Sequence, residues 1–418
     1  MKVIIIGAGI GGLVCAIACR REGLSVTVLE RTPVLAPVKK LGAKSVLLDS
    51  IDYLRYENGE VIFKIDGANT ILDKFGDIWM VIGRPDYHDV LVNTAREAGV
   101  EINLDSEVDT IDFNNTKIRT KRGETFEADV IVGADGLWSN SRNQLLGRAS
   151  PPAESGDLAY RATISREQLL ALDDPSINKL IQEKSAKCWM GPGRHCVFYP
   201  LAGGEVFNLV LLRPDNLDKD VRQAPGDIDE MRACFEGWDQ RLTRMISCIS
   251  TVLKWKLCHH EELVTWTKGS VALLGDACHP TLPYQAQGAA MAVEDGAVLG
   301  KLLGLLDKSQ IHDEKNHIPE ILKLYESLRK TRTTTNVQGA NSNRVSYHLP
   351  DGPLQQERDA CLSRGVRSLT GVRNHFADLE YLRSLLAFDA VGEAIQAFEK
   401  WQASQTGSSA EKVVLAKL

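Results

Sequence analysis

The sequence lacks the features of several functional classes. The first apolar run, Val3 to Ile6, is only four residues long and passes into glycines, so we expect neither a signal peptide nor a membrane span. The nine cysteines are scattered without a C-x-x-C pair, which favours reduced thiols in an intracellular compartment over disulfides. A net charge of −6 without a dense Lys/Arg run gives no basic field, so we expect neither a nucleic-acid partner nor stable membrane insertion.

The composition present is that of a folded protein of more than one domain. Hydrophobic residues make up 44% and charged residues 25% of the chain, which is ordinary for a globular protein. At 418 residues it is too long for one simple core, and two interleaved domains are expected. Such a chain has room for a large cofactor, so small-molecule chemistry is the favoured class of function.

The N-terminus has the pattern of a dinucleotide-binding turn. Lys2 to Ile6 is a β-branched run, a glycine-rich stretch follows it, and Leu13 to Arg21 is predicted to be a helix. Three glycines have separate roles in such a turn: the first allows the tight bend, the second lets a pyrophosphate approach the backbone, and the third lets helix and strand pack closely. These glycines are Gly7, Gly9 and Gly12.

A carboxylate ends the next predicted strand. Ser25 to Leu29 is apolar and β-branched, and Glu30 follows it. A carboxylate at this place accepts hydrogen bonds from ribose hydroxyls and repels a 2′-phosphate. The coincidence of strand, glycines, helix, strand and acid favours dinucleotide binding over simple packing, but it leaves FAD and NAD both open.

Two later motifs also follow predicted strands. The first, Gly133 to Arg142, contains Asp135, for which the alternative is an ordinary turn with a helix cap. The second, Gly275 to Pro280, contains Asp276, for which the alternative is a plain turn acid. From Ala289 through Leu306 the chain is small and apolar, as in a helix packed on a sheet.

In these motifs and their order, the chain closely resembles the class A flavoprotein monooxygenases, specifically their salicylate-hydroxylase-like branch. The resemblance covers most of residues 1 to about 395. It is carried by the segments Gly7 to Gly12, Glu30-Arg31, Arg84, Asp129 to Arg142, Val271 to Pro280, Gln287 to Asp295 and Leu385 to Ala394.

The resemblance implies FAD as cofactor and NAD(P)H as co-substrate. Asp276 would bind the ribityl chain, and the backbone N–H groups of Gly288 and Ala289 would face the flavin pyrimidine edge. Arg84 would contact FAD, although a solvated surface cation is the alternative. Asp135 would lie where FAD and the nicotinamide cofactor meet. The remaining cofactor-binding residues expected are Gly7, Gly9, Gly12, Glu30 and Arg31.

The family chemistry implied is hydroxylation through a flavin C4a-hydroperoxide made with O2, on a small aromatic, phenolic or polyketide-like substrate. No protein nucleophile is needed. Arg161 matches a family arginine that faces a phenolate or carboxylate, and an exposed sheet-edge cation is the alternative. Tyr199 is either a pocket hydroxyl or a packing residue. No third ligand joins Cys278 and His279, so no metal site is expected.

One departure from the family pattern leaves other functions open. The family has a G-x-G-I-x-x-x-P segment and a helix where this chain passes from Val38 directly to Lys39, and this difference puts FAD binding in doubt. The alternatives are a flavoprotein dehydrogenase, an alkene epoxidase, or a degenerate, non-catalytic flavin-fold protein. We expect a monomer or homodimer in the cytoplasm, with the peroxisome as the alternative because the chain ends in Ala416-Lys417-Leu418.

The predicted fold class is α/β. It combines a Rossmann-like, GR2-type FAD-binding domain with an inserted, mostly antiparallel β-sheet substrate domain and C-terminal helices. The FAD-binding domain is expected to be discontinuous, over residues 1–40, 84–150 and 266–320. The substrate-binding sheet is expected over 41–83 and 151–265, and the helical region over 321–418, with a polar break from Asn341 to Pro353.

Overall fold

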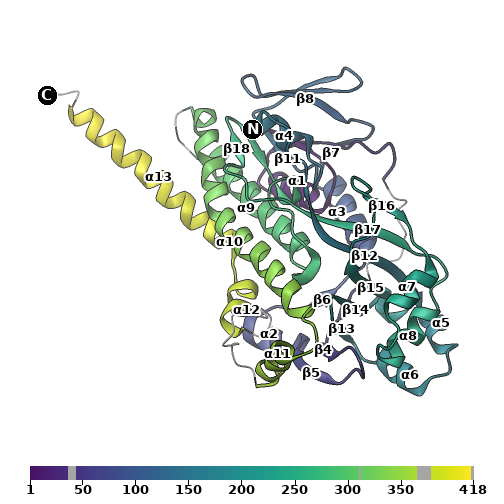
Figure 1. The fold of residues 1–418 in the computed structure, drawn as a ribbon. Coiled ribbons are helices and arrows are strands. Elements are labelled where there is room, and N and C mark those ends of the chain that lie inside the picture. Colours follow the sequence, from purple (N-terminus) through teal and green to yellow (C-terminus); the bar gives the residue numbers. More distant parts are fainter. Residues whose placement is uncertain (36–43, 310, 312, 365–377, 416–418) are drawn as a thin grey trace.

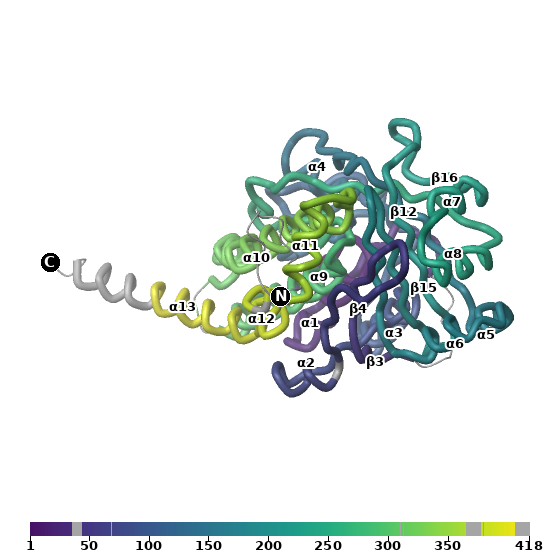
Figure 2. The backbone as a smooth tube through the Cα atoms, turned by 60° about the horizontal axis from the view of Figure 1, so that its bottom comes forward, coloured from purple at the N-terminus to yellow at the C-terminus, as the bar shows by residue number. Residues whose placement is uncertain are grey.

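The computed structural model describes residues 1–35, 44–309, 311, 313–364 and 378–415. The junction of Val38 and Lys39, where a segment of the family pattern is missing, and the C-terminal tripeptide lie outside these residues. The described chain contains two main sheets, a long helical layer and a C-terminal helix that extends away from the body (Figures 1 and 2).

The first sheet has six strands in the order β18-β19-β11-β1-β2-β7, and all neighbours are parallel except the β18–β19 pair. Its strands are β1 (Lys2–Ile6), β2 (Ser25–Leu29), β7 (Glu101–Asn103), β11 (Val130–Gly133), β18 (Thr267–Lys268) and β19 (Val271–Leu273). Because parallel strands end at the same edge of a sheet, the turns after β1, β11 and β19 meet there. This edge therefore collects the three motifs of the sequence.

The second sheet has eight strands in the order β16-β17-β12-β15-β14-β13-β4-β5. Only β13 and β4 pair in parallel, so the predicted, mostly antiparallel sheet is confirmed. The strands are β4 (Ser50–Arg55), β5 (Val61–Asp66), β12 (Ala153–Ser165), β13 (Ser185–Gly191), β14 (Arg194–Leu201), β15 (Val206–Pro214), β16 (Gln223–Pro225) and β17 (Leu253–His259). A three-stranded sheet consists of β8 (Val108–Asp112), β9 (Lys117–Thr120) and β10 (Thr125–Glu127), and a two-stranded one of β3 (Val46–Leu47) and β6 (Met80–Val81).

Helices cover both sheets. The six-stranded sheet packs against α1 (Ile10–Arg21), α3 (Arg84–Glu97), α4 (Asn140–Leu146) and α9 (Gly288–Lys308), and α1 and α9 pack closely on each other through small residues. The eight-stranded sheet carries α5 (Arg166–Leu170), α6 (Pro175–Gln182), α7 (Ile228–Cys234) and α8 (Gln240–Ser247), whose apolar residues share one buried core with it. Helix α2 (Ala68–Phe75) lies near β5.

The C-terminal helices are α10 (Ile318–Tyr347), α11 (Pro353–Arg364), α12 (Leu379–Leu386) and α13 (Ala390–Leu415). The predicted break from residue 341 was wrong in its first part, because α10 continues to Tyr347. Asn343 and Ser346 are polar but fully buried, and the Asn343 amide donates to the Tyr284 carbonyl oxygen over 3.2 Å. Tertiary hydrogen bonding thus keeps a polar segment helical.

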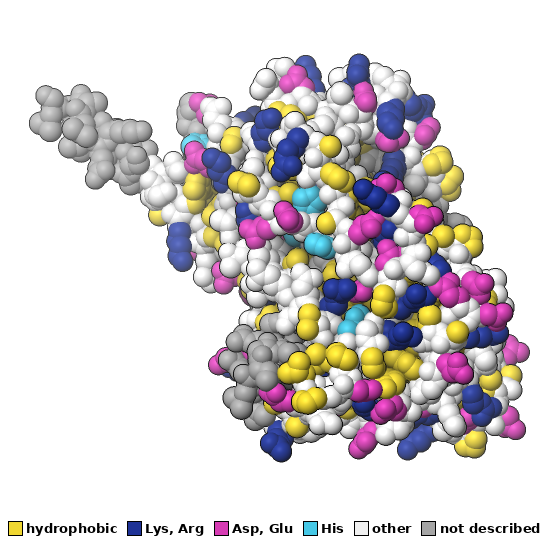
Figure 3. All heavy atoms as spheres, viewed as in Figure 1, with side chains coloured by type: hydrophobic (Ala, Val, Ile, Leu, Met, Phe, Trp, Pro, Cys, Tyr) yellow, Lys and Arg dark blue, Asp and Glu magenta, His cyan; other side chains and the backbone are white. Residues whose placement is uncertain are grey.

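None of the described helices combines the length and apolar composition needed to cross a membrane. In the view of Figure 3, basic and acidic side chains are interspersed over the surface of the body.

Candidate flavin site and the family of the chain

The glycine turn after β1 packs against the two other motifs. A methyl group on Gly7, where φ is +104°, would lie 2.6 Å from the Ala134 carbonyl oxygen and 3.3 Å from the Asp135 Cα. A methyl group on Gly11 would lie 2.6 Å from a side-chain carbon of Leu274, the residue before the second acidic motif. The three turns therefore converge, as the sequence predicted.

The same turn leaves an open approach to helix α1. Gly9 is exposed, and a methyl group on it would meet no other atom within 4 Å. By contrast, a methyl group on Gly12 would overlap the Gly7 carbonyl oxygen. No side chain caps α1 and no acid lies in its first turn, so its first N–H groups are available to an anion. These features fit a pyrophosphate.

Glu30 lies beside the turn. Its Oε2 accepts a hydrogen bond from the Ala8 N–H over 2.7 Å, and its Oε1 accepts one from the Thr32 N–H over 2.9 Å. The carboxylate is half-buried and so remains accessible to a ribose. Arg31 is exposed, and no hydrogen bond or ion pair joins it to these groups in the described part of the chain. His88 of α3, which the sequence did not single out, contacts the Ala8 carbonyl oxygen at 2.7 Å.

Asp135 organises the turn after β11. Its carboxylate accepts hydrogen bonds from the Ser139 hydroxyl over 2.5 Å and from the Ser141 N–H over 2.9 Å. The helix cap itself is Ser139, which accepts from the Arg142 N–H. The alternative that Asp135 itself caps the helix is therefore wrong, because Ser139 is the cap; Asp135 binds the cap residue and is half-buried next to Gly7.

Asp276 lies in the short turn that follows β19. Its side chain is exposed, yet desolvation by the surrounding protein raises the pKa of its carboxyl, and the charges of His279 and Arg84 only partly oppose this rise. Arg84, at the start of α3, is exposed and interacts electrostatically with Asp276.

Asp295 of α9 holds the loop that carries Asp276. It is fully buried; its Oδ2 accepts a hydrogen bond from the Gly275 N–H over 3.1 Å and lies 2.5 Å from Nε2 of His279. Burial alone would raise the Asp295 pKa, but the charges of His279 and Arg329 outweigh burial and lower it. Both ends of the loop are thus fixed by one carboxylate. The sequence placed Asp295 in a family segment but did not reveal this contact.

Helix α9 begins at Gly288 and has no side-chain cap or acid in its first turn. Gly288 is half-exposed and Ala289 is exposed, so the uncapped start of a 21-residue helix lies at the surface near the Asp276 loop. Such a helix end stabilises a negative charge by about 0.3–1 kcal/mol, more when partly buried. The two residues therefore fit the role of an anion-stabilising edge.

Arg161 and Tyr199 lie on one face of the eight-stranded sheet. Arg161 pairs with Val210, Val210 pairs with Val197, and Tyr199 is two residues further along β14, so the alternation of strand side chains puts Arg161 and Tyr199 on the same side. Desolvation lowers the pKa of Arg161, and the nearby Arg84 guanidinium lowers it further. Desolvation also raises the pKa of Tyr199, although the Arg161 charge opposes this rise.

Electrostatic interactions therefore link the predicted residues in a chain: Asp276 with Arg84, Arg84 with Arg161, and Arg161 with Tyr199. No carboxylate among the described residues forms an ion pair with Arg84 or Arg161. No group of three or more His, Cys, Asp or Glu side chains in the described residues is arranged to hold a metal ion.

Comparisons with known proteins agree with this geometry. A family model described as "FAD binding domain" matches residues 55–340, and one described as "NAD(P)-binding Rossmann-like domain" matches residues 5–37. The FAD-dependent monooxygenase OpS4 of Beauveria bassiana is 36% identical over 390 residues, which cover 87% of this chain and 89% of that protein. The chain belongs to the class A flavoprotein monooxygenases.

Other flavoprotein monooxygenases support the same assignment. The 3-hydroxybenzoate 6-hydroxylase 1 of Aquipseudomonas alcaligenes is 34% identical over 328 residues, covering 72% of this chain and 80% of that protein. A salicylate hydroxylase substrate complex superposes with a TM-score of 0.75 at 21% identity, covering 95% of this chain and 98% of that one. The predicted family, fold class and FAD cofactor are thus confirmed, and the chain is an FAD-dependent oxidoreductase of the monooxygenase type.

Proposed function

We propose that this flavoprotein monooxygenase uses NAD(P)H and O2 to hydroxylate a small aromatic or phenolic substrate that carries an acidic group. The observation that carries the proposal is the electrostatic interaction between the guanidiniums of Arg84 and Arg161, neither of which forms an ion pair with a carboxylate among the described residues. Two like charges held close together in a desolvated place favour an anionic ligand.

FAD would be held by the three converging turns. Its pyrophosphate would lie on Gly9 and the start of α1, its ribose on Glu30, its ribityl chain on Asp276, and its pyrimidine edge on Gly288 and Ala289. The open space above Gly9 and the uncapped starts of α1 and α9 fit such a group. When bound, FAD would supply reduction by NAD(P)H and oxygen transfer from the C4a-hydroperoxide that the family resemblance implies.

The protein would contribute binding, orientation and exclusion of water. Arg161 would hold the acidic group of the substrate and keep a phenol ionised, because a nearby cation lowers the pKa of a phenol. Tyr199 would present its hydroxyl to the same pocket. The printed names of several relatives, 3-hydroxybenzoate and 3-amino-4-hydroxybenzoate hydroxylases among them, denote acidic aromatic substrates and support this class.

The domain boundaries given from the sequence stay part of this proposal. The FAD-binding domain would comprise residues 1–40, 84–150 and 266–320, and the substrate domain 41–83 and 151–265. The two main sheets draw their strands from these two sets of segments, which supports the division. We also propose that the protein is a monomer or a homodimer, and light scattering tests its oligomeric state.

The test is turnover with labelled oxygen. The FAD-loaded protein is incubated with NADH or NADPH, ¹⁸O2 and each member of a panel of phenols and benzoates. The masses of the products are then measured by mass spectrometry. The proposal expects faster NAD(P)H oxidation with an acidic phenol and one ¹⁸O atom in a hydroxylated product. An oxidised product without label would indicate a dehydrogenase, and a labelled epoxide would indicate an epoxidase. Turnover no higher than that of free FAD would indicate a non-catalytic flavin-fold protein.

A further inference from the structure

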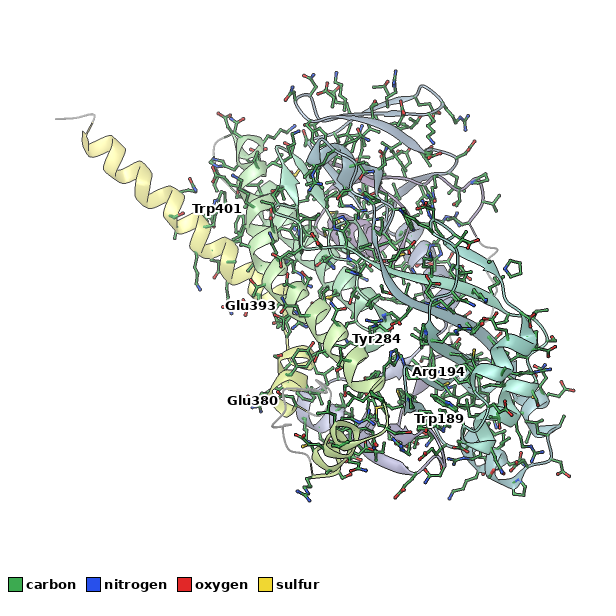
Figure 4. All side chains as sticks on the ribbon, in the orientation of Figure 1. Trp189, Arg194, Tyr284, Glu380, Glu393 and Trp401 are labelled. Atoms are coloured by element: carbon green, nitrogen blue, oxygen red, sulfur yellow. The ribbon has the colours of Figure 1, made fainter. Side chains whose placement is uncertain are left out.

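A short turn directly precedes the helix start that would face the flavin. This turn, η3 (Pro283–Gln285), is followed within three residues by Gly288, where α9 begins. Tyr284 and Gln285 are 3% and 1% exposed, so the turn is fixed by the side chains around it rather than by solvent. Figure 4 labels Tyr284 in this turn and Glu380 at the start of α12.

The C-terminal helices supply those contacts. The Tyr381 hydroxyl of α12 lies 2.9 Å from Oε1 of Gln285 and 2.8 Å from Oδ1 of Asn336 on α10. Both partner atoms are amide oxygens, which only accept, so the one hydroxyl proton is donated to one of them at a time. Tyr381 thus joins the turn and α10 through one shared oxygen.

Helix α10 is shaped to receive this contact. Gly339 lies opposite Gln285 and Tyr381: a methyl group on it would overlap Nε2 of Gln285 and lie 2.9 Å from the Tyr381 hydroxyl oxygen. The missing side chain therefore lets the turn, α10 and α12 meet at one point.

Helix α12 is also tied to α9 itself. Arg332 of α10 donates to the carbonyl oxygens of Ser384 and Leu385 at the end of α12, over 2.8 and 3.0 Å. The same guanidinium pairs with Glu294 of α9 over 2.8 Å. The start of α12 thus fixes the turn before α9, and its end is linked to the body of α9.

We propose that Tyr381 is a positioning residue for the flavin: through Gln285 it sets the orientation of the first N–H groups of α9. This inference rests on the proposed function, because it assumes that Gly288 and Ala289 face the flavin. A helix start that points at the pyrimidine edge stabilises the negative charge of the reduced flavin. A loosened turn would weaken that stabilisation and also lower the affinity for FAD.

The test is Tyr381→Phe, which removes the hydroxyl and keeps the ring. In the FAD-free protein, hydrogen exchange at the amides of residues 286–291 should become faster, with other regions unchanged. The Kd for FAD should rise by about 2- to 10-fold, as for the loss of one neutral hydrogen bond. The midpoint potential of the bound flavin should become more negative, and its visible absorption spectrum should change.

Tyr56→Phe is the matched control, because its hydroxyl donates to Asp351 over 2.8 Å and its ring packs against Trp238, neither of which belongs to the turn or to α12. It should leave all these quantities unchanged. Gly339→Ala, which displaces Gln285 from the other side, should reproduce the Tyr381→Phe pattern of exchange and potential.

Wild-type exchange rates, FAD affinity and potential in a folded Tyr381→Phe protein would overturn the inference. Wild-type protein that takes up no FAD would instead overturn the proposed function. If Gly339→Ala fails to fold, the hydrogen-exchange rates and the flavin midpoint potential of Tyr381→Phe alone test the inference.

Discussion

Nη1 of Arg142 donates a hydrogen bond to the carbonyl oxygen of Ala277 over 3.2 Å, although 135 positions separate the two residues. The other end of the guanidinium, Nη2, donates to the carbonyl oxygens of Leu137 and Ser150 over 2.8 and 2.9 Å. Arg142 therefore joins the turn that carries Asp135 to the turn that carries Asp276. One buried side chain thus fixes the positions of the two acidic motifs relative to each other.

Arg142→Met should lower the free energy of unfolding by roughly 2–4 kcal/mol, because three buried carbonyl oxygens lose their donor. Urea denaturation measures this loss. Arg148→Met, on the exposed residue after the same helix, is the control and should change stability by no more than about 0.5 kcal/mol. Equal stability of the two variants would contradict the linking role of Arg142.

Gly9→Ala and Gly12→Ala should separate cofactor binding from folding. Gly9 has extended backbone and open space around it, so alanine fits the protein but occupies the approach of the pyrophosphate. We expect an unchanged unfolding midpoint with at least about tenfold weaker FAD binding. Gly12→Ala should instead cost about 1–3 kcal/mol of stability through overpacking. Calorimetry and FAD titration distinguish the two, and a destabilised Gly9→Ala would contradict this prediction.

Arg161→Gln should raise KM for an acidic aromatic substrate by about 10- to 100-fold, as for the loss of a charge-assisted hydrogen bond. The increase should disappear with an analogue that lacks the acidic group, because the guanidinium then has no anion to bind. Steady-state kinetics with both compounds measures the difference. Arg119→Gln, on an exposed strand of the three-stranded sheet, is the control. An equal increase for both compounds would show that Arg161 acts only on the shape of the pocket.

His348 should make stability depend on pH. Burial lowers its pKa to about 4; Asp157 opposes this shift, while Arg344 and Arg194 add to it, and Nδ1 of His195 lies 2.7 Å from its Nε2. An unfolded histidine binds its proton near pH 6.5, so the unfolded state takes up the proton first as pH falls. Stability is therefore full above about pH 6.5 and falls by roughly 2–3 kcal/mol toward pH 4.

His348→Gln should flatten this slope between about pH 4 and 6.5. Urea denaturation at several pH values measures the slope in both proteins. The comparison at pH 8, where the histidine is neutral in both states, gives the cost of the substitution itself. If the stability of the variant fell as steeply with decreasing pH as that of the wild type, His348 would not be the group responsible.

Much of the site could be predicted because its chemistry depends on residues that are close together in the sequence. The strand, glycine turn and helix from Lys2 to Arg21 follow from β-branched residues, backbone freedom at Gly7 and an apolar helical stretch. The order of parallel strands then brings Asp135 and Asp276 to the same edge as Gly9.

Other contacts could not be predicted, since they join residues that are remote in the chain. The burial of Asn343, which extends α10, depends on the Tyr284 carbonyl oxygen, and the role of Asp295 depends on the Gly275 N–H and His279. Neither side chain has a local signal, because a polar residue in a helix is usually exposed. The contact of Tyr381 with Gln285 likewise requires the docking of α12.

The sequence by itself determined the family and the cofactor and predicted which residues approach it, because phosphate and ribose binding require particular residue types at fixed local spacing. Only the tertiary structure decided which buried side chains hold those residues in place, since hydrogen bonds such as Arg142–Ala277 and Tyr381–Gln285 form between elements that meet only after the sheets and helices have packed.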